Sequence, residues 1–122
     1  MPTIVYVVGF KPDERAWIES ALKRDIASVV FLDDEKALFA NEASNPGQCV
    51  IAAADVDPAA TLKLVRELRD SHITIPVIVL GPYAAFRTAI DIARLEATDF
   101  LERPVSVLQL RAAVHRACMD SR

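Results

Sequence analysis

The chain alternates two kinds of hydrophobic pattern, and this alternation limits the folds open to it. Short runs of β-branched and other apolar residues, typical of strands buried on both faces, alternate with segments whose apolar residues recur at helical spacing. The first run, Thr3 to Val8, is almost entirely β-branched. Only a few residues separate each run from the helical segment that follows it. Such alternation favours an α/β fold, a parallel sheet covered by helices on both faces.

The pattern predicts five strands and five helices in a single domain over residues 1–122. The strands are expected over residues 3–8, 28–32, 49–54, 77–80 and 98–101. The helices are expected over residues 12–24, 35–43, 59–70, 85–95 and 107–117. Pro12 and Pro58 suit first helical positions, and Asn45-Pro46-Gly47 is expected to end the second helix.

The charge balance and hydropathy exclude several classes of protein. The 14 basic and 17 acidic residues give a formal net charge of −3, with no basic cluster to bind nucleic acid directly. No apolar run reaches the roughly 20 residues of a membrane span, and the first residues lack the basic segment of a signal peptide. We therefore expect a cytoplasmic domain that binds neither nucleic acid nor membrane.

The cysteines and histidines give no motif for a metal or redox centre. Cys49 and Cys118 lie far apart in the sequence without a CxxC or His-paired context, so two reduced thiols are expected. His72 and His115 have no neighbour at ligand spacing. No nucleophile has a base at recognisable spacing and no phosphate-binding loop is present, so neither a cofactor nor enzymatic activity is expected.

The ends of the expected strands carry almost no reactive groups. Ligands of open parallel sheets bind outside the carboxyl ends of the strands. Here the first strand is followed by Gly9 and Phe10, and the third runs through Ala52, Ala53 and Ala54. The position at which chemistry is expected is therefore occupied by small or apolar residues.

Two segments carry a family resemblance. LVRELRDSHITIPVIVL (residues 64–80) and ATDFLERPVSVLQL (residues 97–110) resemble the receiver domains of bacterial two-component response regulators. They look most like receivers attached to LuxR-type DNA-binding domains. The resemblance implies a flavodoxin-like three-layer sandwich with strand order 2-1-3-4-5.

The resemblance assigns roles to five positions, and none holds the usual residue. The phosphoacceptor aspartate falls on Ala53, and the Mg²⁺-binding acidic pair falls on Gly9 and Phe10. The hydroxyl residue after strand four matches Gly81, and the lysine matches Arg103. The resemblance also suggests that the proline bond after Arg103 is cis. Because alanine has no oxygen to form an acyl phosphate and Mg²⁺ needs oxygen ligands, we expect no phosphorylation and no metal here.

Displaced acids offer one way to rebuild such a site. Asp13, Asp55 and Asp57 all lie on loops at the carboxyl end of the expected sheet. We instead favour Asp57 as a helix cap, Asp13 in a helical first turn, and Asp55 either solvated or paired with Arg103.

The resemblance also places an output surface on the fourth helix, the fifth strand and the fifth helix. Phe100 matches the switch aromatic, although Gly81 lacks the hydroxyl that would couple to it. This surface is either a protein interface, for which a homodimer is one form, or an ordinary solvated rim. Its residues are Ile90, Asp91, Arg94, Glu96, Asp99, Glu102 and Arg111.

Two functions from different classes follow. The first is a phosphorylation-independent signalling and protein-interaction domain, either free-standing or the regulatory domain of a transcriptional regulator. The second is a small-ligand sensor using a crevice lined by Gly9, Phe10, Ala53 and Gly81, with Tyr83 and Arg103 as further contacts. In the first case Phe10 simply fills the vacant pocket.

Overall fold

The computed structural model describes residues 4–23, 28–55, 58–82 and 99–119. The strands are β1 (Ile4–Val8), β2 (Ser28–Leu32), β3 (Cys49–Ala53), β4 (Val77–Gly81) and β5 (Asp99–Glu102). The helices are α1 (Pro12–Leu22), α2 (Glu35–Ser44), α3 (Pro58–Asp70) and α5 (Val107–Met119). These match nine of the ten expected elements closely; the helix expected over residues 85–95 lies outside the described residues.

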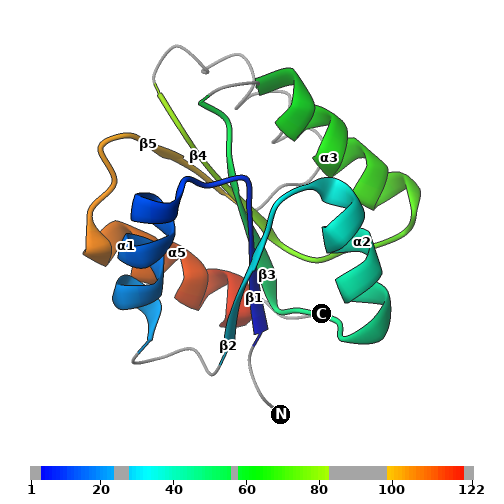
Figure 1. The fold of residues 1–122 in the computed structure, drawn as a ribbon, viewed down its shortest axis with the longest axis horizontal. Helices are drawn as coiled ribbons and strands as arrows, with labels where there is room; N and C mark the ends of the chain where they lie inside the picture. Colours follow the sequence, from blue (N-terminus) through cyan, green and yellow to red (C-terminus); the bar gives the residue numbers. More distant parts are fainter. Residues whose placement is uncertain (1–3, 24–27, 56–57, 83–98, 120–122) are drawn as a thin grey trace.

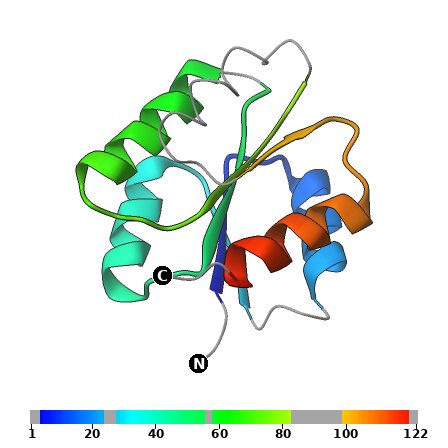
Figure 2. The ribbon, with the colours of Figure 1, turned by 180° about the vertical axis from the view of Figure 1, so that it is seen from behind.

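The five strands form one parallel sheet in the order β2-β1-β3-β4-β5, as the sequence predicted. Helices α1 and α5 cover one face, and α2 and α3 cover the other (Figure 1). The view from behind shows the same three layers (Figure 2). All carboxyl ends of the strands therefore meet at one edge, which positions the candidate site.

Side chains of each central strand alternate between two cores. Val5 and Val7 of β1 face the core shared with α1 and α5, whereas Tyr6 and Val8 face the core shared with α2 and α3. This period of two is the physical reason that the central strands read as continuous apolar runs.

Local residues explain where the helices begin and end. Pro12 occupies the first turn of α1, where its missing N–H costs nothing. Asp34 caps α2 by accepting a hydrogen bond from the Ala37 amide at 2.9 Å. The α2 helix ends at Asn45, where the sequence predicted its end. No helix within the described ranges is long and apolar enough to cross a membrane.

Candidate functional site

The residues after β1 offer no ligand at the strand edge. Gly9 is exposed and has a φ of +83°, a conformation that side-chain-bearing residues rarely adopt. Phe10 is only 5% exposed and packs in the core with Ile18 of α1. Phe10 is therefore surrounded by apolar side chains, as expected if it simply fills the vacant pocket.

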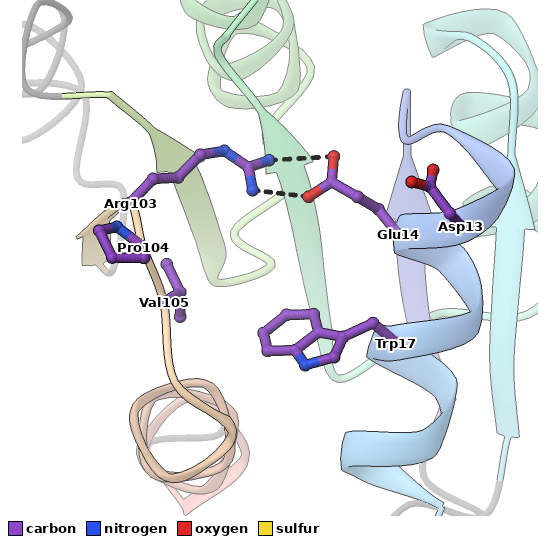
Figure 3. Close-up of a pocket in the computed structure, with 6 residues that line it drawn as sticks. All are labelled: Asp13, Glu14, Trp17, Arg103, Pro104 and Val105. Carbon is purple, nitrogen blue, oxygen red and sulfur yellow. Dashed lines mark hydrogen bonds and ion pairs between the residues drawn. The ribbon is translucent and has the colours of Figure 1, made fainter.

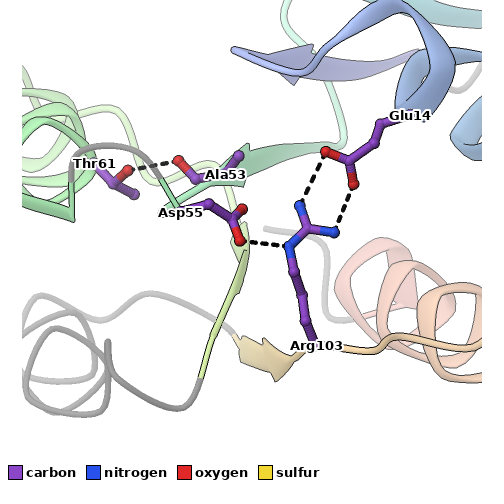
Figure 4. Close-up of polar contacts among 5 residues, drawn as sticks. All are labelled: Glu14, Ala53, Asp55, Thr61 and Arg103. Atoms are coloured by element: carbon purple, nitrogen blue, oxygen red, sulfur yellow. Dashed lines mark hydrogen bonds and ion pairs between the residues drawn. The ribbon is translucent and has the colours of Figure 1, made fainter.

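The end of β3 is closed by backbone and hydroxyl hydrogen bonds. Ala53 is the last residue of β3, and its carbonyl accepts a hydrogen bond from the Thr61 hydroxyl at 2.9 Å (Figure 4). The Ala54 amide donates to the Leu80 carbonyl of β4 at 2.8 Å. The last residue of β3 thus presents a methyl group at this edge and no side-chain oxygen.

The principal polar feature of the site is an arginine held between two carboxylates. Arg103 follows β5, and its Nε donates to Oδ2 of Asp55 at 2.6 Å. Its Nη1 and Nη2 donate to the two carboxylate oxygens of Glu14 at 2.6 and 3.2 Å. Figure 4 shows the guanidinium between the two acids. We call Glu14, Arg103 and Asp55 the ion bridge; it joins α1 to the segments after β3 and β5.

The sequence predicted one half of the ion bridge. The pairing of Asp55 with Arg103 was one of two expected outcomes and is confirmed. The role of Glu14 was missed, because a helical first turn predicts acidic residues without saying which one faces the sheet edge. The cis peptide between Arg103 and Pro104 agrees with the resemblance, and Asp13 lies in the first turn of α1 as expected.

Arginine suits this position better than lysine would. The guanidinium fork matches a carboxylate with two parallel N–H groups and still has Nε free for a second acid. Burial alone would lower the pKa of Arg103, but hydrogen bonds and charge interactions with Asp55 and Glu14 outweigh it and raise the pKa further. Arg103 is therefore permanently charged, and each of its three nitrogens donates to one of the two acids.

The end of β4 is packed against the aromatic ring of β5. A Cβ atom on Gly81 would lie 3.2 Å from Cζ of Phe100 and 3.3 Å from Cβ of Ala54. The Arg103 amide also donates to the Gly81 carbonyl at 2.9 Å. The half-buried ring of Phe100 thus lies against the space that a hydroxyl side chain at position 81 would need.

Among the described residues, one cavity lies beside Glu14 and Arg103 of the ion bridge, and another lies beside Gly9 and Ala53. The larger, about 550 Å³, lies between α1 and the segment after β5, with Arg103 and Glu14 facing each other above Trp17 (Figure 3). The smaller, about 370 Å³, includes Gly9 and Ala53 among its lining residues. Phe10 and Gly81 line neither of these two cavities, and Phe10 is only 5% exposed. The ligand crevice lined by Gly9, Phe10, Ala53 and Gly81 stays a prediction.

Sequence comparisons find relatives among response regulators. No family model matches the sequence. The chain is 29% identical over 114 residues to the response regulator protein PilR of Pseudomonas aeruginosa, which covers 91% of this chain and 25% of PilR. It is 30% identical over 69 residues to the transcriptional regulatory protein ZraR of Escherichia coli, which covers 57% of this chain and 15% of ZraR.

Solved structures share the fold over nearly the whole chain. The receiver domain of NtrX from Brucella abortus has a TM-score of 0.85 at 22% identity, covering 96% of this chain and 99% of that one. The receiver domain of TorR has a TM-score of 0.88 at 16% identity, covering 99% and 100%. Full-length FixJ from B. japonicum has a TM-score of 0.85 at 20% identity, covering 96% and 58%.

The chain has the fold of response-regulator receiver domains and is similar in sequence to response regulators. The resemblance to receiver domains and the flavodoxin-like fold expected from the sequence are thereby confirmed. The narrower resemblance to LuxR-type receivers stays a prediction. The chain matches only 25% of PilR and 15% of ZraR, so these relatives are considerably longer proteins.

The residues at the strand edge do not fit the Mg²⁺ ion that the resemblance to receiver domains implies. Mg²⁺ needs several oxygen ligands in near-octahedral geometry, whereas Gly9 and Ala53 have no side-chain oxygen and Phe10 is buried. Among the acids around this edge, Glu14 and Asp55 are bonded to Arg103, and Asp33, which lines the cavity with Gly9 and Ala53, is bonded to Arg15. Within the part of the chain that the structure describes, no three His, Cys, Asp or Glu residues are grouped to hold a metal ion.

The expected output surface is only partly described. Asp99 accepts hydrogen bonds from Arg116 at 2.6 Å and from the Phe100 amide at 3.1 Å. Glu102 is exposed and Arg111 is half-buried. The other residues named for this surface or for the crevice, and one expected cap, lie outside the described residues: Asp57, Tyr83, Ile90, Asp91, Arg94 and Glu96.

Proposed function

We propose that this receiver domain is a signalling and protein-interaction module that works without phosphorylation. One observation carries the proposal: alanine stands at the end of β3, and the polar groups beside it are joined in the ion bridge. An acyl phosphate needs a carboxylate at the acceptor position, and Ala53 has none. The nearest carboxylate on the same segment, Asp55, is bonded to Arg103 at 2.6 Å.

In this proposal the ion bridge stabilises the strand edge with charges that belong to the domain itself. Arg103 links Glu14 at the start of α1 with Asp55 after β3, and its amide is bonded to Gly81 of β4. The strand edge is therefore cross-linked by internal charges without any bound ion or covalent group. A two-state equilibrium shifts only when a bound group interacts more favourably with one state than with the other. Because the ion bridge occupies Glu14 and Asp55, a phosphoryl group has no position at this edge from which it could shift the equilibrium.

The contact between Gly81 and Phe100 supports the same proposal. A phosphoryl signal in a receiver is passed from a hydroxyl after strand four to the aromatic of strand five, as the resemblance implies. Here position 81 has no hydroxyl, and the Phe100 ring lies against its backbone. We infer that the ring keeps one position and that any change of state comes from a bound partner.

The names of the relatives suggest the kind of protein in which such a domain acts. ZraR is named as a transcriptional regulatory protein and PilR as a response regulator, and both are several times longer than this chain. We propose that the domain is the regulatory part of such a protein, acts in the cytoplasm through protein contacts, and has no enzymatic activity. A homodimer through β5, α5 and the helix expected over residues 85–95, without direct nucleic-acid contacts, is the arrangement to test first.

A magnesium titration of the intact domain tests this proposal. Thermal unfolding and the fluorescence of Trp17, the single tryptophan, which lies beside the ion bridge, are followed as Mg²⁺ rises. A site at ten times its Kd would gain about 1.4 kcal/mol, or several degrees in Tm. We expect a change below about 1 °C at about 10 mM Mg²⁺. A saturable rise that the E14Q/D55N double variant loses would refute the proposal.

The larger cavity favours a second function, sensing of a small organic cation. Its walls combine the aromatic face of Trp17 with the exposed carboxylate of Asp13, while Arg103 is neutralised by its two acids. Phenylethylammonium is a suitable probe, because a cation over an indole ring gains cation–π energy. Saturable quenching of Trp17 that D13N weakens would support this function; linear quenching equal in both proteins would exclude it for this probe.

A further inference from the structure

The two cysteines lie at the same apolar core in the folded domain, although no sequence motif pairs them. Cys49 is the first residue of β3, and Cys118 lies in the last turn of α5, which packs against β3. Cys118 packs against the apolar core to which Cys49 belongs, and the interaction between the two thiols shifts their pKa values in opposite directions. Both cysteines are free thiols. The packing of α5 on the sheet therefore brings together two cysteines that lie far apart in the sequence.

The two thiols differ in exposure. Cys49 is fully buried in the core between the sheet, α1 and α5. Cys118 is half-buried and packs against the edge of the same core. A small oxidant can therefore reach Cys118 from solvent, whereas Cys49 is shielded by the core.

The thiols also differ in ionisation. The interaction with Cys49 lowers the pKa of Cys118 to about 7, although partial burial opposes the shift. The same interaction and complete burial raise the pKa of Cys49 well above its usual range. At neutral pH the accessible sulfur is thus the one that carries thiolate, and thiolate is the nucleophilic form of cysteine.

We propose that Cys118 and Cys49 form a redox pair that a peroxide converts into an intramolecular disulfide. The Cys118 thiolate attacks the O–O bond of hydrogen peroxide and becomes a sulfenic acid, while hydroxide leaves and takes up a proton to form water. The Cys49 sulfur then attacks Cys118, the S–O bond breaks, and the oxygen leaves as water with the Cys49 proton. The two thiols lose two electrons and the peroxide gains them.

The disulfide would fix the end of α5 to the sheet. It closes a loop of about 70 residues, and a loop of this length restricts the unfolded chain strongly. Oxidation would therefore lock the last described helix of the domain, and this inference does not depend on the proposed function.

Oxidation of the full chain with hydrogen peroxide tests the pair. The reduced protein, freed of reductant, is treated at neutral pH and analysed by intact mass, thiol titration and non-reducing electrophoresis. We expect a monomer about 2 Da lighter, with no free thiol and a Tm raised by at least about 5 °C, all reversed by dithiothreitol. Dimers linked between chains, or sulfinic acid formed with both thiols still separate, would overturn the proposal.

Single variants assign the roles of the two sulfurs. C49A is expected to stop at a Cys118 sulfenic acid that dimedone traps, and C118A is expected to react at least tenfold more slowly than the wild type. Equal reaction of C118A and the wild type would contradict the order of attack. If C49A does not fold, alkylation of the wild type with limiting iodoacetamide replaces it: label must appear on Cys118 first, and label on Cys49 first would refute the order.

Discussion

Removing the positive charge at the centre of the ion bridge is the sharpest structural perturbation. The variant R103M keeps the aliphatic stem and deletes the guanidinium, so three charged hydrogen bonds to Glu14 and Asp55 are lost. The side chains of Arg103, Glu14 and Asp55 are 26, 31 and 32% exposed. Water therefore replaces part of what the two acids lose.

The expected cost lies between those of an exposed and a buried ion pair. Exposed pairs contribute about 0 to 1 kcal/mol, whereas breaking a buried pair costs about 3 to 5 kcal/mol. For three short hydrogen bonds at about one-third exposure we expect R103M to lose about 2 kcal/mol. R103K keeps the charge but cannot bond both acids in fork geometry, so we expect about half that loss.

Urea unfolding at low and high salt measures this cost. The ion pair between Arg116 and Asp99 is a matched control, because it is equally short at 2.6 Å but Arg116 is 57% exposed. R116M should lose no more than about 0.5 kcal/mol, and raising NaCl to about 0.5 M should abolish this loss while leaving most of the R103M loss. The urea m-value should stay constant in both variants.

A loss below about 0.5 kcal/mol in R103M would refute the reasoning. So would equal losses in R103M and R116M, because the difference in exposure would then have no effect. A double-mutant cycle of R103M with D55N separates the Asp55 contact, for which we expect a coupling of about 1 kcal/mol.

Three further changes test the packing around the site, each measured by urea unfolding. G81T places a Cβ within 3.2 Å of the Phe100 ring, so we expect a loss of about 1 to 3 kcal/mol that F100A partly relieves; an unchanged midpoint would contradict the contact. D34A removes the cap of α2 and should cost about 1 kcal/mol, whereas D33A, at an exposed ion pair, should cost less than about 0.5 kcal/mol. Y6F deletes a hydroxyl that donates to backbone carbonyls at the end of α2 and should cost about 1 kcal/mol, and no loss would exclude that bond.

The sequence was sufficient for the fold because the sheet is buried on both faces. A run such as Val5 to Val8 is apolar without alternating polar residues, which is typical of a strand buried on both faces. Pro12 and Asn45 mark where helices begin and end. The strand order came from the family resemblance and is confirmed. Local pattern thus determines the elements, and their bounds differ from expectation by only a residue or two.

The site could be predicted only in part, because its contacts join distant positions. The resemblance to receiver domains singled out Arg103, and Asp55 was one of its expected partners. Nothing in the local sequence distinguishes Glu14, which also bonds Arg103, from its neighbour Asp13. The proximity of Cys49 and Cys118 depends on how α5 lies on β3, which no spacing in the sequence reveals. Such contacts are set by tertiary packing, which residue patterns along the chain do not report.

The intact mass of the domain after treatment with acetyl phosphate and Mg²⁺ tests the central claim most directly. A phosphorylatable receiver treated in parallel controls for the activity of the reagent. The account predicts no adduct on this domain, because Ala53 has no carboxylate and Asp55 is bonded to Arg103. An increase of about 80 Da that disappears in D55N would contradict it and would identify Asp55 as the acceptor.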